Sequence, residues 1–386
     1  MARSPVHCMS FSVLVLPLAL AVAYLLAAFP SPPAPITVHQ SLASLPQTSR
    51  SWTIYPEDFY PGGAYAELPY GKVRYWLMGP EKGRKIVLIH GLSIPAIIWK
   101  DVAPALASNK YRVLVYGASF LRRTLETSYS SPAADLYGRG YSDAPQTTYD
   151  PTLYTTQLAL LMQHIRWDKA IVCGVSMGGG IAAAFTSQFP QLVDENVVLI
   201  ASAGIMDSGD ISRTAKFMSS PLVQTLASSG PVRHYLQRLA NSSSSSVTAA
   251  MEGAESSNND SDPPDAATNA PHSASVQAAL EIVRLQSAHL PGYNAALSSS
   301  LRDGPIRGQH HAFTSKGFED RRVLLIHGTK DATVHPRYAE GIMDLLPEKT
   351  RRKSKVVYVD GAGHDLTLTE PERVGGAMWE WFEGRG

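Results

Sequence analysis

The residues best suited to chemistry in this sequence form a Gly-x-Ser-x-Gly pentapeptide centred on Ser176. The pentapeptide follows an apolar run, 170–173, and precedes a run of small and apolar residues, 179–185, that favours a helix. A serine on a sharp turn from strand to helix presents its hydroxyl clear of the backbone, where it can act as a nucleophile. Gly174 and Gly178 fit this interpretation, because larger side chains would collide with the neighbouring strand and helix. The alternative is a glycine-rich turn without chemistry.

A nucleophilic serine needs a base to take its proton and a carboxylate to orient that base. Both follow downstream, in loops that come directly after predicted strands: Asp331 after 322–328 and His364 after 355–360. The carboxyl ends of parallel strands share one edge of a sheet, so we expect both side chains near Ser176. His364 would then accept the serine proton, and Asp331 would orient His364.

Two other carboxylates could take the place of Asp331. Asp360 ends the second of these strands, and Asp365 is adjacent to the base and would point away from it. Asp331 is preferred, because a loop between a strand and a helix lets its carboxylate reach the base from the edge of the sheet.

Two backbone N–H groups are expected to stabilise the negative charge that develops on an attacked carbonyl oxygen. One belongs to Met177, the residue after the serine, and the other to Leu92, because a predicted strand over 85–92 runs into a His-Gly turn. His90 in that turn precedes Ser176, whereas the base of such a site follows the serine in the chain. We therefore expect His90 to brace the loop.

The elements that must position these residues alternate along the chain. Apolar runs and turn residues predict two strands around Gly71 within 64–78, and further strands over 111–116 and 197–200. Apolar residues at helical spacing predict helices over 155–167, 276–284 and 336–346.

Together these motifs resemble those of α/β-hydrolase fold serine hydrolases. The resemblance covers roughly residues 64–382 and includes the His-Gly turn, the segment 135–143, the serine turn, and the loops of the acid and the base. It implies an α/β fold with helices on both faces of a mostly parallel sheet and a helical cap insertion. The Gly-x-Ser-Met-Gly-Gly form of the turn is similar to that of monoacylglycerol lipases and related esterases. Epoxide hydrolases and haloalkane dehalogenases of this fold carry aspartate where this chain has Ser176.

The resemblance and the composition divide the chain into regions. Residues 1–30 form a signal anchor or signal peptide, and residues 31–50 form a proline-rich linker. The hydrolase core follows in two parts, 51–205 and 316–386, with a cap region over 206–315 between them. A Ser-rich patch within the cap, 241–274, has too little apolar content to offset the entropy of ordering, so we expect it to be disordered.

One stretch departs from the family pattern. The strand predicted over 111–116 should pass directly into the segment that begins at Asp135, but the polar residues 117–134 intervene. Joining Tyr116 to Asp135 restores the pattern without a gap, so we interpret the stretch as a retained intron or a gene-model error. The alternative is a genuine surface loop, whose closure entropy would be small.

The N-terminus carries a separate signal. Residues 11–29 are uncharged and mostly apolar, and a run of roughly 20 such residues can span a bilayer. Arg3 precedes the run and no Lys or Arg follows it until Arg50, which predicts that the catalytic part is lumenal or extracellular. An uncleaved signal anchor is favoured over a cleaved signal peptide, which would leave a secreted protein.

Composition excludes several other classes. The 34 Lys and Arg residues nearly balance 33 Asp and Glu, and no basic patch suggests nucleic-acid binding. Two cysteines, Cys8 and Cys173, cannot form a disulfide framework. No Cys/His spacing typical of zinc and no phosphate-binding glycine loop is found, so we expect neither a metal nor a cofactor.

The sequence thus predicts a membrane-anchored serine esterase that cleaves small-molecule or lipid-like esters, such as monoacylglycerols, through an acyl-enzyme on Ser176. A peptidase, a thioesterase or an acyltransferase with the same triad is an alternative, as is a non-catalytic ligand-binding homologue. Acyl chain length, leaving group and oligomeric state stay open.

Overall fold

The computed structural model describes residues 15–24, 35–115, 135–211, 216–217, 219–220 and 273–384. It divides into two units, Met1–Thr37 and Val38–Gly386. In the first unit residues 15–24 are helical, and the rest of the apolar run 11–29 lies outside the described residues. No helix in the described ranges has both the length and the hydropathy that a membrane span requires.

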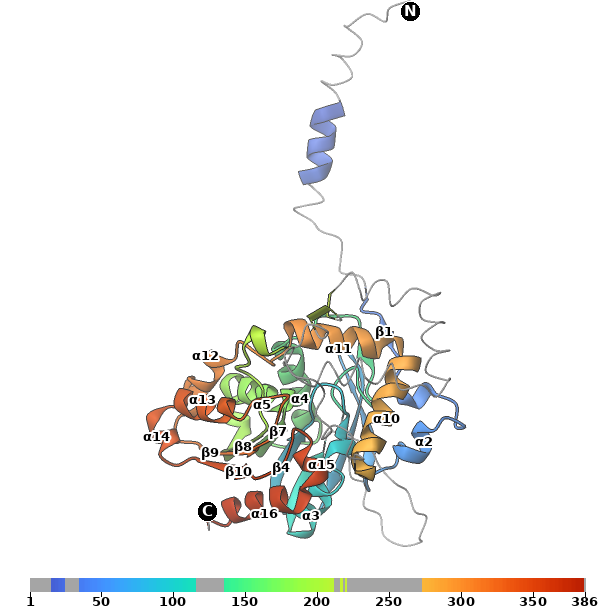
Figure 1. The fold of residues 1–386 in the computed structure, drawn as a ribbon. Helices are drawn as coiled ribbons and strands as arrows, with labels where there is room; N and C mark the ends of the chain where they lie inside the picture. Colours follow the sequence, from blue (N-terminus) through green and yellow to red (C-terminus); the bar gives the residue numbers. More distant parts are fainter. Residues whose placement is uncertain are drawn as a thin grey trace, which may run out of the picture. The chain divides into compact units, whose positions relative to one another are not determined.

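An eight-stranded sheet forms the centre of the second unit (Figure 1). Its spatial order is β10-β9-β8-β7-β4-β5-β3-β2. The strands are β2 (Gly63–Leu68), β3 (Gly71–Met78), β4 (Arg84–Ile89), β5 (Tyr111–Val115), β7 (Ala170–Val175), β8 (Val193–Ile200), β9 (Arg322–Gly328) and β10 (Lys355–Val359). β3 is antiparallel to β2 and β5, and the other neighbouring pairs are parallel. The predicted α/β architecture with a mostly parallel sheet is confirmed.

The central strands are apolar because both of their faces are covered. Every residue of β7 is buried, as is the carboxyl-terminal half of β4. Continuous rather than alternating apolar runs are typical of parallel strands that lie between two layers of helices. At the edge of the sheet, β2 has only one buried residue, Ala66.

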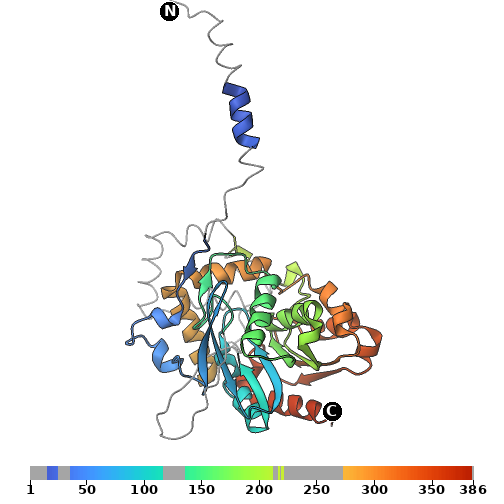
Figure 2. The ribbon, with the colours of Figure 1, turned by 180° about the vertical axis from the view of Figure 1, so that it is seen from behind.

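Two pairs of helices cover the faces of this sheet (Figures 1 and 2). On one face α3 (Val102–Ser108) packs on β5 and on α16 (Pro371–Phe382). On the other face α4 (Pro151–His164) packs on α5 (Met177–Gln188), which contacts β7, β8 and β4. The helix α13 (Arg337–Leu345) follows β9 and packs on β9 and β10.

The remaining elements are short or belong to the cap. They are β1 (Val38–His39), β6 (Ala144–Pro145), α2 (Ser51–Ile54), α10 (Ala274–His289), α11 (Pro291–Asp303), α12 (His310–Phe313), α14 (Glu348–Arg351), α15 (Leu366–Thr369), and the 3-10 turns η1 (Leu42–Ser44), η2 (Ala96–Trp99), η3 (Pro190–Leu192), η4 (Ser208–Asp210) and η6 (Lys316–Phe318). The helices α10 and α11 pack on each other, and α11 also contacts β1 and β6.

The predicted helix boundaries differ from the structure by several residues at α4 and α10, and by one residue at each end of α13. The helix expected over 155–167 begins at Pro151, because the Asp150 side chain caps the N–H of Leu153 and proline suits the first turn. It ends at His164. The cap helix α10 begins at Ala274, capped by Ser273, so the last residue assigned to the Ser-rich patch is helical. Residues 241–272 and the stretch 117–134 lie outside the described residues.

The predicted linker over 31–50 is shorter than expected. Val38 and His39 pair with β6, and Leu42 is fully buried and donates its N–H to the carbonyl of Gly140 (2.9 Å). Proline content suggested an extended tether, but apolar residues beyond the last proline of the cluster pack on the core and end it.

Candidate active site

Ser176 occupies the turn between β7 and α5 with a backbone that few residues adopt, φ +56° and ψ −124°. The turn is held from both sides: the Ser176 N–H donates to the carbonyl of Ile200 (2.9 Å), and the Ser176 carbonyl accepts from Ala203 (3.0 Å). A Cβ on Gly174 would lie 2.1 Å from the carbonyl oxygen of Gly178, and one on Gly178 would lie 2.3 Å from a carbonyl oxygen of β4. Only glycine fits at either position.

The structure brings the three predicted triad residues into one chain of hydrogen bonds. The Oγ of Ser176 lies 3.0 Å from Nε2 of His364, and Nδ1 of His364 lies 2.8 Å from Oδ2 of Asp331. Since a carboxylate can only accept, Nδ1 carries the proton and Nε2 is the acceptor for the serine hydroxyl. This arrangement suits proton transfer from Ser176 to His364.

The carboxyl group of Asp331 is held in its ionised form. Its Oδ1 accepts from the N–H groups of Thr333 (2.9 Å) and Val334 (2.8 Å). Burial raises the pKa of Asp331, but the positive charge of His364 in its protonated form and hydrogen bonds from His327, His364 and Val334 outweigh burial and hold the pKa below its usual value. Asp331 therefore stays negative beside the imidazole.

His327 is a site residue that sequence reasoning missed. Its Nε2 lies 2.7 Å from the carbonyl of Val334 and 3.3 Å from Oδ2 of Asp331, and it is almost fully buried. The available signal was its position at the end of β9, four residues before Asp331. A histidine in a strand is as readily a core residue, so the sequence alone could not assign it.

A cavity opens at the serine. Ser176, His364 and the two residues predicted to supply oxyanion donors, Leu92 and Met177, all line it. Most of the remaining lining is apolar and comes from the segment after β8, from the described part of the cap and from the loop after β9: Ala203, Met206, Ile211, Leu301, Ile306, Ala332 and Val334. The polar exceptions are Thr333 and Asp210.

His90 is not one of the residues that line this cavity. Its Nδ1 donates to the carbonyl of Gly91 (2.9 Å), and its Nε2 accepts from the N–H of Leu136 (3.2 Å). Burial and the nearby Arg139 charge lower the pKa of His90 to about 3, so the ring is neutral. This geometry matches the loop-bracing role expected from its place before the serine.

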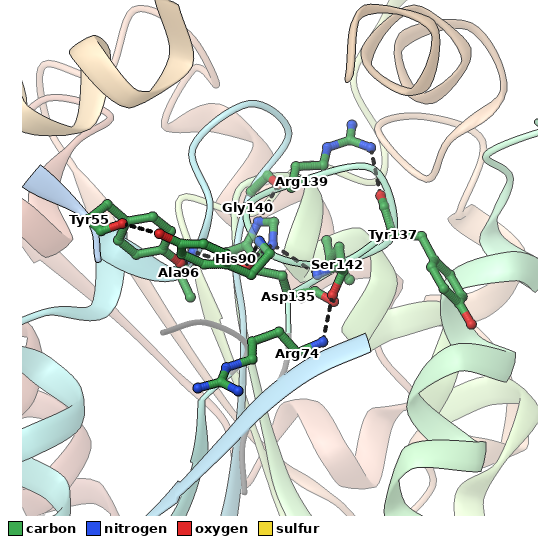
Figure 3. Close-up of polar contacts among 12 residues, drawn as sticks. Tyr55, Arg74, His90, Ala96, Asp135, Tyr137, Arg139, Gly140 and Ser142 are labelled. Atoms are coloured by element: carbon green, nitrogen blue, oxygen red, sulfur yellow. Dashed lines mark hydrogen bonds and ion pairs between the residues drawn. The ribbon is translucent and has the colours of Figure 1, made fainter. Parts of the chain in front are cut away.

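Asp135 is the centre of a buried polar cluster under the same loop (Figure 3). Its Oδ2 accepts from the N–H of Tyr141 (2.7 Å), and its Oδ1 accepts from the Tyr55 hydroxyl and the Ala96 N–H (both 3.4 Å). Burial raises the pKa of Asp135 to about 8, against the lowering effect of these donors. A Cβ at Gly140 would lie 2.0 Å from the Asp135 carboxylate, which explains the glycine there.

Arg139 belongs to the same cluster and is 1% exposed. The sequence placed it only within the family segment 135–143. An arginine in a loop is usually solvated, so nothing in its local sequence indicated that it would be buried.

Other reactive groups are few. Cys173 on β7 is a fully buried free thiol whose pKa burial raises, and Cys8 lies outside the described residues. In the described ranges no three His, Cys, Asp or Glu side chains are placed to hold a metal ion.

Comparison with known proteins gives one broad match and several partial ones. A family model described as "Alpha/beta hydrolase family" matches residues 86–377. A soluble epoxide hydrolase from Corynebacterium sp. is 29% identical over 128 residues, 33% of this chain and 38% of that protein. A serine hydrolase-like protein from Danio rerio is 26% identical over 141 residues, 36% of this chain and 37% of that protein. The chain thus spans well under half the length of these curated relatives.

Solved structures resemble the chain over most of its length. An enol-lactonase from Burkholderia xenovorans superposes with a TM-score of 0.56 at 17% identity, covering 83% of this chain and 100% of that one. The carboxylesterase CesB from Bacillus subtilis gives 0.56 at 18% identity, covering 87% of this chain and 95% of that one. At these identities the likeness concerns the fold.

Proposed function

Because this chain belongs to the alpha/beta hydrolase family, we propose that it is a serine hydrolase that cleaves carboxylic esters through an acyl-enzyme on Ser176. The observation that carries the proposal is the continuous relay from Ser176 through His364 to Asp331, with distances of 3.0 and 2.8 Å. Ser176 also lines a cavity that a substrate could enter. This position supports a nucleophilic role for the serine over a purely structural role for the turn.

The reaction proceeds in two halves. Ser176 Oγ attacks the ester carbonyl carbon while its proton passes to Nε2 of His364. The tetrahedral intermediate collapses, the ester C–O bond breaks, and the departing alcohol takes the proton from His364. Water then attacks the acyl-enzyme, gives a proton to His364, and the carboxylic acid leaves as that proton returns to Ser176. Asp331 holds the imidazole in the required tautomer throughout.

The negative charge of each tetrahedral intermediate needs donors that are already in place. The N–H groups of Leu92 and Met177 supply them in this proposal, and one such donor typically contributes about 3 kcal/mol to lowering the barrier. Both residues border the cavity that contains Ser176 and His364.

The substrate class proposed is a lipid-like ester, of the monoacylglycerol type. Apolar side chains dominate the cavity wall, with Met206, Ile211 and Ile306 on the side of the cap. Such a wall favours an aliphatic acyl chain, since burying it removes apolar surface from water. The similarity to an epoxide hydrolase does not favour epoxide hydrolysis, because this chain has Ser176 where epoxide hydrolases of this fold carry an aspartate.

The N-terminal segment is the second part of the proposal. The uncharged run 11–29, preceded by Arg3, supports a signal anchor with the catalytic part lumenal or extracellular. Alkaline carbonate should then leave the protein in the membrane pellet, and protease added to intact microsomes should spare the catalytic part. Digestion of the catalytic part would indicate the opposite orientation, with that part on the cytosolic side. Release of a shortened soluble chain would indicate a cleaved signal peptide.

A fluorophosphonate probe tests the catalytic proposal directly. The wild-type chain should be labelled and should hydrolyse p-nitrophenyl and glycerol esters, whereas Ser176→Ala should do neither. Equal labelling of both would show that Ser176 is not the nucleophile. Labelling without turnover of any ester in the panel would point to another acyl substrate, such as a peptide or a thioester.

A further inference from the structure

Residues 91–94, here called the oxyanion loop, are held by an unbroken row of buried donors. Three successive carbonyls each accept a hydrogen bond from a buried side chain: Gly91 from His90 (2.9 Å), Leu92 from Arg139 (2.8 Å) and Ser93 from Tyr293 (3.0 Å). Each of the three donor side chains is at most 1% exposed. Figure 3 shows His90 beside Asp135, and the guanidinium of Arg139 directed away from Asp135 toward the backbone of Tyr137.

Two of these donors connect the loop to the cap helix α11. Tyr293 lies on α11 itself. Arg139 reaches the same helix through Nη2, which donates to the hydroxyl of Ser300 (2.9 Å), and through Nη1, which donates to Tyr154 (3.1 Å). The Tyr154 hydroxyl lies 2.7 Å from that of Ser300, so the guanidinium, the phenol and the serine form a closed set of bonds.

This set of bonds has a consequence for the N–H of Leu92. A peptide unit is planar and trans, so its C=O and N–H point in opposite directions. Fixing the Gly91 carbonyl through His90 therefore fixes the direction of the Leu92 N–H, and fixing the Leu92 carbonyl through Arg139 holds the next peptide unit. The space in front of Gly91 leads to the nucleophile, since a Cβ there would lie 3.7 Å from Ser176 Oγ.

We propose that Arg139 and Tyr293 are positioning residues of the oxyanion hole, through which the cap helix α11 sets the geometry of the Leu92 N–H. The inference rests on the proposed hydrolase function, because it assigns that N–H a role in the transition state. It goes further because it gives α11 a part in the chemistry as well as a part in covering the substrate. Leu301, next to Ser300, lines the cavity, so the same helix would contact the substrate and hold the Leu92 N–H in place.

Arg139 also acts on His90. The positive charge of Arg139 contributes to keeping the pKa of His90 low. A neutral His90 is required, since its Nε2 must accept from Leu136 while Nδ1 donates to Gly91. Asp135 also faces this ring, with its Oδ1 at 3.8 Å from Nε2 of His90.

Three variants test the proposal on the full chain: Tyr293→Phe, Ser300→Ala and Arg139→Met. Loss of a whole oxyanion donor costs on the order of 100- to 1000-fold in kcat, so loosening one should cost about three- to tenfold for the first two and about 10- to 100-fold for Arg139→Met. KM should stay within about threefold, and a boronic acid that mimics the intermediate should lose affinity by the same factor as kcat/KM. Tyr149→Phe is the matched control, because it also removes a buried tyrosine hydroxyl that donates to a carbonyl at 3.0 Å, that of Pro145.

A second measurement does not depend on ester hydrolysis. Amide hydrogen exchange in a peptide covering 91–94 should accelerate in Tyr293→Phe and Ser300→Ala and stay unchanged in Tyr149→Phe. Unchanged exchange, or a rise in KM alone with full kcat and full boronate affinity, would overturn the inference even if Arg139→Met fails to fold. A wild-type chain inert to esters and to the fluorophosphonate would count against the proposed function, while the exchange result would still decide whether α11 holds the loop.

Discussion

Asp331 is the residue whose role is most sharply defined by its surroundings. It accepts from Nδ1 of His364 and from the backbone N–H groups of Thr333 and Val334. Asp331→Asn should lower kcat by about four orders of magnitude, because the imidazole would lose its tautomer and its counter-charge. Steady-state kinetics with a short ester measures this.

The matched controls are the two carboxylates that the sequence left as alternatives. Asp360 is exposed and accepts from the Thr329 hydroxyl (3.1 Å), and Asp365 precedes the short helix α15. Asp360→Asn and Asp365→Asn should retain wild-type turnover. Near-normal turnover in Asp331→Asn together with loss in either control would transfer the role.

A second residue-level prediction concerns pH and stability. The pKa of Asp135 is about 8 in the folded protein, against roughly 3.9 for an aspartate in an unfolded chain. Between these values the folded protein keeps a proton that the unfolded chain has lost, so the free energy of unfolding falls as the pH rises, by at most about 1.4 kcal/mol per pH unit. Asp135→Asn, which cannot titrate, should flatten this slope in urea unfolding measured across the window. Parallel slopes in the two proteins would mean that Asp135 is already ionised when folded.

Among the elements, the turn at Ser176 was readable from the sequence because its requirements are local. Strand, glycines and helix lie within a few residues of one another, and steric exclusion at Gly174 and Gly178 follows from the turn itself. The arginine and tyrosine that donate to the oxyanion loop could not be identified from the sequence, since Arg139 and Tyr293 meet Leu92 and Ser93 only through the tertiary fold. The boundary of α4 could have been found from Asp150 and Pro151, which signal a helix start.

The glycines of two helices give a matched prediction. A Cβ at Gly178, in the first turn of α5, would lie 2.3 Å from the Ile89 carbonyl oxygen, whereas one at Gly376 in α16 meets nothing within 4 Å. Gly178→Ala should therefore lower the melting temperature and abolish turnover. Gly376→Ala should raise stability by roughly 0.5–1 kcal/mol, from helix propensity alone, with turnover unchanged. Thermal unfolding and ester kinetics on both variants check this, and a tolerated Gly178→Ala would refute the steric account of the turn.

For the molecule as a whole, the sequence predicted the sheet and the chain order of the site but not how the cap meets the core. Central strands are recognisable because they are apolar along their length. The contacts of α11 with β1 and β6 join segments far apart in the chain, and no local pattern encodes such a pairing. The same holds for residues 38–50, whose short strand and single buried leucine give little periodicity.

The stretch 117–134 can be tested at the level of the whole chain. Strand β5 ends at Val115, before the stretch. Asp135, the first residue after the stretch, is the centre of the buried polar cluster and accepts from the N–H of Tyr141. A direct join of Tyr116 to Asp135 would therefore continue the strand into the turn. The deleted protein should express at least as well as the full chain and hydrolyse short esters at least as fast. Sequencing the mature transcript gives an independent answer. An inactive deletion beside an active full chain would identify a genuine functional loop.

The buried thiol of Cys173 on β7 can be used to measure local opening of the folded protein. Cys173 is fully buried on β7, the strand between β4 and β8, so a thiol reagent can reach it only when the layers packed on the sheet open locally. In a Cys8→Ser background it is the only cysteine in the chain, and its modification rate in native buffer gives the free energy of that opening. The same strand ends at Ser176. The rate of Cys173 modification can be compared with the rate of inactivation at elevated temperature. The comparison would show whether activity is lost because the core around Cys173 opens first or because the cap does.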